Sequence, residues 1–271
     1  MSSYVITGVA RGVGWAFLTQ LSSNPNNTVI GIVRNKTATE KKVAEELSGR
    51  SNITILEADV CKYADLVRAA DEASAVTGGR LDYLIANAAY LQAFDAFDGI
   101  GTLAESPERL AEEFHKTMTT NVLGNIYLFK LFLPQIRNGK AKKVIALSSG
   151  MADDDFTNNF DVTISSLNAM GKAAMNTATA KYNAQYKKEG ILFLNICPGV
   201  VNTGHLDAPT PEQMVNLNIL WGQFTKYAPH FKGAASPEEA ARDVLSVVHN
   251  ASLEKGDGGQ FLSHYGNKQW L

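Results

Sequence analysis

Short apolar runs rich in β-branched residues alternate along the chain with longer amphipathic stretches, and the pair recurs about every 25 to 30 residues. Most of the short runs are continuously apolar, as expected for strands that helices cover on both faces. The predicted strands span residues 4–7, 28–34, 53–57, 81–86, 143–147, 191–196 and 260–263. The predicted helices span residues 12–23, 39–48, 63–77, 107–136, 165–188 and 237–250. Because crossovers between parallel strands are right-handed, this order predicts an α/β fold with a doubly wound, parallel, seven-stranded sheet.

Two segments interrupt the alternation. Residues 148–163 follow the fifth predicted strand, and residues 200–235 follow the sixth. Long insertions after the carboxyl ends of parallel strands lie where such sheets bind ligands, so we expect both to wall an active site, the second as a substrate lid. The apolar spacing of the second segment fits an ordinary amphipathic helix packed on the domain equally well. The chain has no internal repeat or linker, and one sheet needs all seven strands, so residues 1–271 are predicted to form a single domain.

Composition and charge exclude several classes of protein. The 271 residues include 25 Lys plus Arg and 27 Asp plus Glu, a net charge of −2, which offers no electrostatic footprint for nucleic acid or an anionic membrane surface. The two cysteines, Cys61 and Cys197, provide neither a disulfide framework nor the spacing of metal ligands. No apolar run is long enough to span a membrane, and Met1 leads into a strand without a basic, cleavable leader. We therefore expect a cytoplasmic protein with no metal.

A glycine-rich turn joins the first predicted strand to the first predicted helix. It reads Thr7-Gly8-Val9-Ala10-Arg11-Gly12-Val13-Gly14. Glycines let a backbone turn sharply and approach a pyrophosphate, and a helix N-terminus offers free N–H groups at its positive end. Because the turn has the strand-turn-helix context that this motif requires, we predict that it binds a dinucleotide.

The turn resembles the TGxxxGxG motif of the short-chain dehydrogenase/reductase family, and further matches follow in order along nearly the whole chain. They are Asp59-Val60 after the third strand, Asn87-Ala88-Ala89 after the fourth, Asn121-Val122-Leu123-Gly124, Ser148-Ser149 after the fifth, and Pro198-Gly199-Val200-Val201-Asn202-Thr203 after the sixth. Ala89 stands where the family's NAG motif has Gly. The resemblance implies a Rossmann-type fold, a small-molecule substrate and a homodimer or homotetramer.

The resemblance also implies roles for these residues. Asp59 and Val60 would bind the adenine, Asn87, Ala88 and Ala89 would line the adenine ribose, and Pro198, Gly199, Val201 and Thr203 would hold the nicotinamide carboxamide. Thr7, Gly8, Arg11, Gly12, Val13 and Gly14 would surround the pyrophosphate. Asn121 would organise a proton relay through water, Ser149 would polarise a carbonyl group, and Lys172 would hold the nicotinamide ribose.

The predicted choice of cofactor depends on charge. Folds of this kind that prefer NAD place an acid at the end of the second strand, where it binds the ribose 2′-hydroxyl. This chain has Arg34 and Asn35 there, with no acid. The forked guanidinium donors of Arg34, with Arg11 on the other side, suit a 2′-phosphate. We therefore predict NADP(H).

The family's YxxxK signature is incomplete. The chain has Asn168-Ala169-Met170-Gly171-Lys172, so the lysine is present and the tyrosine position holds Asn168. An amide donates a hydrogen bond but does not deliver a proton at neutral pH, so Asn168 can orient a substrate without acting as the general acid.

Three alternatives follow from the missing tyrosine. Another group could supply the proton: Tyr90, His205, Lys172 through water, or one of Asp153, Asp154, Asp155 and Asp161. The electrophile could instead be an iminium ion or an activated alkene, which accepts a hydride without a proton on oxygen in the same step. The fold could also host non-redox chemistry such as isomerisation or cyclisation, or a silent nucleotide-binding protein. The leading hypothesis is an NADP(H)-dependent reductase of a fairly apolar small molecule.

Overall fold

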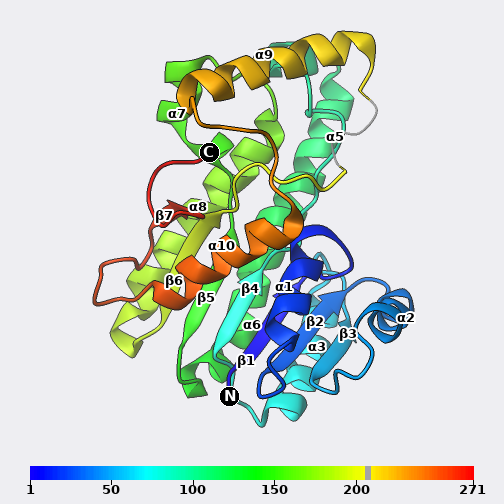
Figure 1. The fold of residues 1–271 in the computed structure, drawn as a ribbon, viewed down its shortest axis with the longest axis vertical. Coiled ribbons are helices and arrows are strands. Elements are labelled where there is room, and N and C mark those ends of the chain that lie inside the picture. Colours follow the sequence, from blue (N-terminus) through cyan, green and yellow to red (C-terminus); the bar gives the residue numbers. More distant parts are fainter. Residues whose placement is uncertain (205–208) are drawn as a thin grey trace.

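Seven parallel strands form the centre of the molecule, in the spatial order β3-β2-β1-β4-β5-β6-β7. The computed structural model describes residues 1–204 and 209–271. The strands are β1 (Ser3–Thr7), β2 (Thr28–Val33), β3 (Ile53–Glu57), β4 (Tyr83–Ala86), β5 (Lys143–Leu147), β6 (Leu192–Cys197) and β7 (Phe261–Ser263). The strand order reverses between β1 and β4, and sheets of this kind bind ligands at the carboxyl ends of the two strands that flank such a point. The predicted doubly wound sheet is confirmed (Figure 1).

Helices cover both faces of the sheet. On one face, α1 (Gly12–Ser22) packs against α10 (Pro237–Asn250), and their apolar residues form one core with β1, β5 and β6. On the other face, α3 (Tyr63–Thr77), α6 (Gly124–Asn138) and α8 (Ser166–Tyr186) form a second core. Helix α2 (Lys36–Glu46) follows β2, and a short 3-10 turn, η3 (Lys187–Glu189), follows α8. Two covered faces explain the continuously apolar strands.

The predicted helix over 107–136 is confirmed as one uninterrupted helical stretch, with a single change of helix type inside it. It consists of α5 (Pro107–Met118), one π-helical turn, η1 (Thr119–Leu123), and α6. The widened turn contains Asn121, whose side chain bonds to the backbone of Tyr90 on a neighbouring loop. The predicted strand 81–86 begins late, at Tyr83, because Leu81 N donates to Gln135 O of α6. The other predicted boundaries differ by a few residues at most.

A third apolar core covers the carboxyl end of the sheet. Three helices outside the alternating pattern accompany it: α4 (Ile100–Leu103), α7 (Asp154–Phe160) and α9 (Pro211–Tyr227). Leu217, Leu220 and Phe224 of α9 pack in this core against Phe156 of α7 and the buried Trp270. In Figure 1, α9 crosses the top of the molecule, above the carboxyl ends of the strands. Both insertions therefore lie over the predicted site. No helix of the described residues combines the length and the apolar character needed to cross a bilayer.

Candidate active site

The glycine turn after β1 is packed so closely that side chains would collide there. Gly8 has a φ of 77° and Gly12 a φ of 58°, both in the left-handed region that favours glycine. A Cβ on Gly8 would lie 2.9 Å from Ala88 Cα, and a Cβ on Gly14 would collide with Gly8 O. The turn thus brings the N-terminus of α1 against the end of β4. The result is a backbone cradle of the kind that approaches a pyrophosphate.

Thr7 and Asn87 connect the ends of β1 and β4. Thr7 Oγ1 accepts hydrogen bonds from Asn87 N at 3.1 Å and Ala88 N at 3.0 Å. In return, Asn87 Nδ2 donates to Thr7 O at 2.9 Å and Gly8 O at 3.2 Å. The structure therefore places the Asn87 motif directly against the glycine turn, and four hydrogen bonds set the distance between the ends of the two strands.

Two arginines lie in and near the turn with no side-chain hydrogen bond or ion pair to the described residues. Arg11 precedes α1 and Arg34 follows β2; both are exposed, and neither side chain makes a hydrogen bond or ion pair within the part of the chain that the structure describes. Gly8 N donates to Ile32 O at 2.8 Å, which holds the glycine turn beside the end of β2. Lys42 of α2 adds a third cation, with Nζ 3.5 Å from Ala10 O and 4.0 Å from the centre of the Trp15 ring. No motif identified Lys42, because its place depends on how α2 packs.

The predicted adenine side lies after β3. Asp59 Oδ1 accepts a hydrogen bond from Cys61 N at 3.0 Å, which sets the turn that carries Val60. A Cβ on Gly124 would lie 2.6 Å from Val60 O, so α6 contacts this turn closely. The structure thus brings the predicted residues Asp59 and Val60 together with the glycine of the Asn121 motif.

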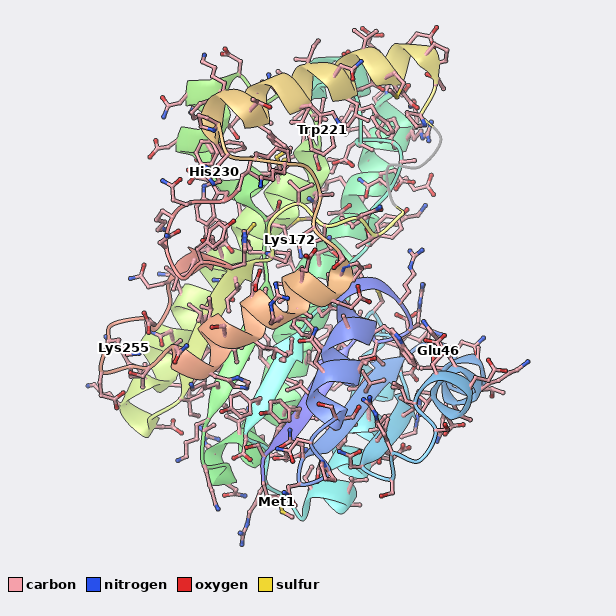
Figure 2. The ribbon with its side chains drawn as sticks, in the orientation of Figure 1. Met1, Glu46, Lys172, Trp221, His230 and Lys255 are labelled. Carbon is pink, nitrogen blue, oxygen red and sulfur yellow. The ribbon has the colours of Figure 1, made fainter. Side chains whose placement is uncertain are left out.

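Lys172 lies deep in the site, near the middle of the molecule in Figure 2. Its Nζ donates to Leu147 O of β5 at 2.6 Å, one residue before Ser148. Burial lowers the pKa of Lys172 to about 8, and the nearby Cys197 opposes this effect only in part. The ammonium is therefore poised to change its charge near neutral pH, a property common among functional groups.

Ser149 caps the 3-10 turn η2 (Gly150–Ala152). Its Oγ accepts a hydrogen bond from Met151 N at 3.3 Å, which leaves the hydroxyl hydrogen available. Its neighbour Ser148 is buried, and the Ser148 hydroxyl donates to Asn176 Oδ1 of α8 at 2.7 Å. Of the two serines, Ser149 is therefore the one whose hydroxyl has a hydrogen left to donate.

Asn168 lies in the first turn of α8, at the position before Lys172 where the sequence motif has tyrosine. Its backbone N donates to Oδ2 of the buried Asp95 at 3.0 Å, and its Nδ2 contacts Ser165 Oγ at 3.4 Å. Its Oδ1 is buried and has no hydrogen-bond partner among the described residues. A buried acceptor without a donor is costly, so a hydrogen bond from water or from a bound molecule would stabilise this amide.

Asn121 does not point freely into the site. Its Oδ1 accepts from Tyr90 N at 2.7 Å and its Nδ2 donates to Tyr90 O at 3.0 Å. Both polar ends of the amide are thus used to pair with one backbone residue, and Asn121 is 1% exposed. The structure assigns this side chain to shaping the loop after β4.

The alternative proton donors predicted from the sequence differ in their hydrogen bonds and in their exposure. Tyr90 donates through its hydroxyl to Glu113 Oε2 of α5 at 2.8 Å, and burial raises its pKa. Asp153 caps α7 through Oδ1 and accepts from Trp270 Nε1 through Oδ2. The remaining acids of the insertion, Asp154, Asp155 and Asp161, are exposed. His205 lies outside the described residues.

The loop after β6 meets the glycine turn. Thr203 Cγ2 lies 3.4 Å from where a Cβ on Gly12 would be, so the two predicted cofactor segments touch. Gly199 has a φ of 80°, and its Cβ would lie 2.8 Å from the His264 ring. Val201 pairs with Ala235, which closes the long insertion at its base. These contacts place the Pro198 motif between the glycine turn and His264.

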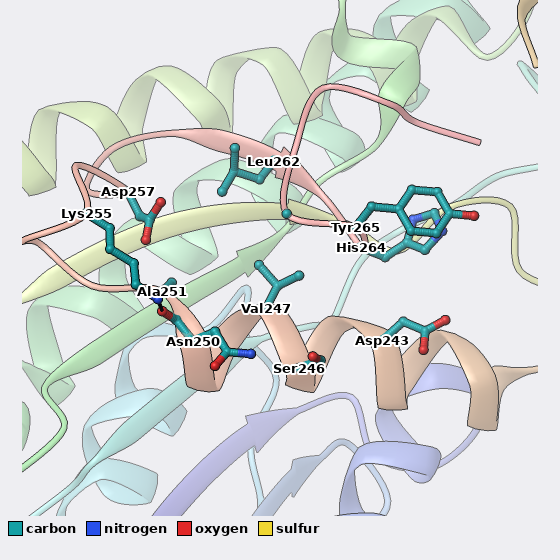
Figure 3. Close-up of a pocket in the computed structure, with 11 residues that line it drawn as sticks. Asp243, Ser246, Val247, Asn250, Ala251, Lys255, Asp257, Leu262, His264 and Tyr265 are labelled. Carbon is teal, nitrogen blue, oxygen red and sulfur yellow. Dashed lines mark hydrogen bonds between the residues drawn. The ribbon is translucent and has the colours of Figure 1, made fainter.

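A cavity of about 480 Å³ lies beside this region, between α10 and the segment around β7 (Figure 3). Its lining includes Asp243, Asn250, Lys255 and His264, and none of the predicted site residues. Burial lowers the pKa of His264, so its ring is neutral at pH 7. The cavity is therefore lined by other residues than the predicted site, and His264, which lines it, also lies against Gly199 of the Pro198 motif.

Fold and site together define a doubly wound α/β protein with a glycine cradle at the point where the strand order reverses. The sequence model described as "short chain dehydrogenase" matches residues 3–213. The chain belongs to the short-chain dehydrogenase/reductase family of oxidoreductases.

Curated relatives extend the match over the whole chain. The short chain dehydrogenase virK of Hypocrea virens is 55% identical over 271 residues, covering 100% of both chains. The short-chain dehydrogenase/reductase iacC of Pestalotiopsis fici is 50% identical, again over 100% of both chains. Among solved structures, the NADPH-bound carbonyl reductase from chicken fatty liver has a TM-score of 0.78 at 20% identity, covering 98% of each chain. The predicted family and fold are thereby confirmed.

Proposed function

We propose that the chain is an NADP(H)-dependent reductase of a fairly apolar small molecule, in which a group other than residue 168 delivers the proton. The observation that carries this proposal is the pair of exposed arginines, Arg11 in the glycine turn and Arg34 after β2, neither of which has a hydrogen bond or ion pair among the described residues. A cradle without side chains suits a pyrophosphate, and two exposed guanidinium groups suit the additional phosphate of NADP(H). That a carbonyl reductase of the same fold binds NADPH supports the same choice.

The residues of the site have distinct tasks under this proposal. When bound, NADPH supplies the hydride. Ser149 donates its free hydroxyl hydrogen to an acceptor atom of the substrate, and the Lys172 ammonium holds the nicotinamide ribose. Asn168 orients the substrate through its unpartnered Oδ1, which suits a substrate that carries a donor group such as a hydroxyl. The insertion over residues 200–235 acts as the substrate lid, and the apolar side chains of α9 match an apolar substrate.

A second candidate is a non-redox enzyme, an isomerase or cyclase, on the same scaffold. The observation that favours it is Asn168 itself, since an amide at this position removes the proton donor of ordinary ketone reduction while leaving the cofactor cradle intact. A silent nucleotide-binding protein would share the cradle and show no turnover.

Titration with NADPH and with NADH, followed by nicotinamide fluorescence, tests the cofactor part of the proposal. We expect saturable binding and a clear preference for NADPH. Absence of binding to either nucleotide would overturn the proposal. With a candidate substrate present, loss of nicotinamide absorbance indicates hydride transfer, whereas product formation without that loss supports the non-redox candidate.

The affinity for NADPH is also expected to depend on pH through Lys172. Its pKa of about 8 means that the side chain is an ammonium below this pH and an amine above it. Hydrogen bonds from a charged donor are stronger, so the dissociation constant should rise by about fivefold between about pH 7 and about pH 9.5. Arginines keep their charge over this range. In Lys172→Met the curve should be flat, and a wild-type curve as flat as that of the variant would contradict the role of Lys172.

A further inference from the structure

The turn that carries Ser149 is held by residues outside every sequence motif, and the main one is Trp270. A Cβ on Gly150 would lie 2.7 Å from Trp270 Cβ, so the backbone next to Ser149 rests directly on the tryptophan. The indole is 2% exposed and stacks on Phe261 of β7, with ring centres 4.3 Å apart. The only hydrogen-bonding atom of this side chain, Nε1, donates to Asp153 Oδ2 at 2.7 Å.

Asp153, which accepts the hydrogen bond from Trp270, also binds the first turn of the inserted helix α7. Its Oδ1 accepts from Asp155 N at 2.9 Å and Phe156 N at 3.3 Å, so it caps the first turn of α7. Both carboxylate oxygens are therefore occupied, one by the helix and one by Trp270. The hydrogen bond to Trp270 has a charged acceptor and a buried donor, which makes it strong.

The backbone of Trp270 reaches helix α9. Its N donates to the Tyr227 hydroxyl at 3.1 Å, and the same hydroxyl donates to Lys268 O at 3.1 Å. The Tyr227 ring also packs edge-on against Phe156, with ring centres 4.7 Å apart. One residue thus contacts the serine turn through Gly150, α7 through Asp153 and α9 through Tyr227.

The opposite side of the turn is held as well. Gly150 N donates to Cys197 Sγ at 3.1 Å, and Gly199 N contacts the same sulfur at 3.4 Å. The Ser149 turn is therefore clamped between Cys197 at the end of β6 and Trp270. Trp270 is the part of this clamp that also contacts the elements covering the site.

We propose that Trp270 is a positioning residue, which holds the Ser149 turn through Gly150 and Asp153 and couples the order of this turn to helix α9. The importance of Ser149 for turnover rests on the proposed function. The coupling itself is a property of the fold and can be measured without a substrate.

Hydrogen exchange in Trp270→Phe tests the proposal. Phenylalanine keeps an aromatic ring against Phe261 but loses the donor and part of the indole volume, so the amides of Gly150 and Met151 should exchange about 10-fold faster or more. Amides of the glycine turn and the affinity for NADPH should stay as in the wild type. A merely structural tryptophan would instead speed exchange throughout the third core, including the amide of Ala96 on the loop after β4, and that pattern would overturn the proposal, as would unchanged exchange at Gly150.

Variants of Asp153 show whether the effect passes through the hydrogen bond. Asp153→Asn keeps one acceptor oxygen of two, so either the cap of α7 or the bond to Trp270 is lost and Gly150 should exchange faster than in the wild type. Asp153→Ala removes both contacts, and Gly150 should exchange at least as fast as in Trp270→Phe. The double variant Asp153→Ala with Trp270→Phe should exchange little faster than Asp153→Ala alone, because that variant already lacks the hydrogen bond to Trp270. Trp221→Phe is the matched control: Trp221 stacks on Phe231 in the same core and has no hydrogen bond to Asp153, so Gly150 should keep its wild-type exchange rate. If NADPH does not bind, the proposed function fails, while these exchange rates still decide the role of Trp270.

Discussion

Arg34→Asp is expected to lower the affinity for NADPH relative to NADH by about 100-fold. The substitution removes an exposed guanidinium at the end of β2 and puts a carboxylate in its place. A carboxylate repels a 2′-phosphate and accepts a hydrogen bond from a 2′-hydroxyl, so the two dissociation constants should move in opposite directions. The measurement is a pair of fluorescence titrations on wild type and variant.

Arg80→Asp provides the control for charge alone. Arg80 is also exposed, but it precedes β4 and so lies at the amino end of the sheet, away from the cradle. The same charge change should leave the ratio of the two dissociation constants unaltered. If the ratio of the NADPH and NADH dissociation constants is unaltered in Arg34→Asp, Arg34 does not bind the 2′-phosphate. Arg11 and Lys42 would then be the cations to replace next.

Asn168→Tyr is expected to create, or raise by about 10²- to 10⁴-fold, the reduction of simple ketones by NADPH. Residue 168 lies one helical turn before Lys172 on α8, so the two side chains share a face of the helix. Lys172 already has a lowered pKa, and Ser149 already has a free hydroxyl hydrogen. A phenol would add the one proton donor that this arrangement lacks. The readout is the loss of nicotinamide absorbance with a panel of small ketones.

Met170→Tyr is the matched control for this gain. Met170 is 36% exposed on the same helix, two residues away and therefore on a different side. A phenol there should give no reductase activity. If Asn168→Tyr folds, binds NADPH and still reduces no ketone, the site is shaped for other chemistry, and the non-redox candidate gains support.

Much of the site could be predicted from sequence because each of its motifs is formed by residues close together in the chain. The glycine turn, the Asn87 motif and the Pro198 motif each follow a strand directly, and the parallel topology brings the ends of those strands to one edge. What sequence could not predict is where individual side chains point. Tyr90 was a candidate donor because it follows Asn87, yet its hydroxyl is engaged by Glu113 of α5. The helix over 107–136 is continuous as expected, and its π-helical turn at Asn121 reflects a contact with a loop 31 residues away.

The sequence by itself determined the family, the doubly wound sheet and the absence of the tyrosine, because alternating hydrophobicity and glycine turns depend on residues close together in the chain. Only the tertiary structure decided that Asp153 caps a helix and accepts from Trp270, which is 117 residues away. Only it showed that Lys172 is buried enough to lower its pKa, that Arg11 and Arg34 have no side-chain hydrogen bond or ion pair in the described chain, and that Asn168 Oδ1 has no hydrogen-bond partner there either. Such properties depend on packing between distant segments, and no local pattern encodes them.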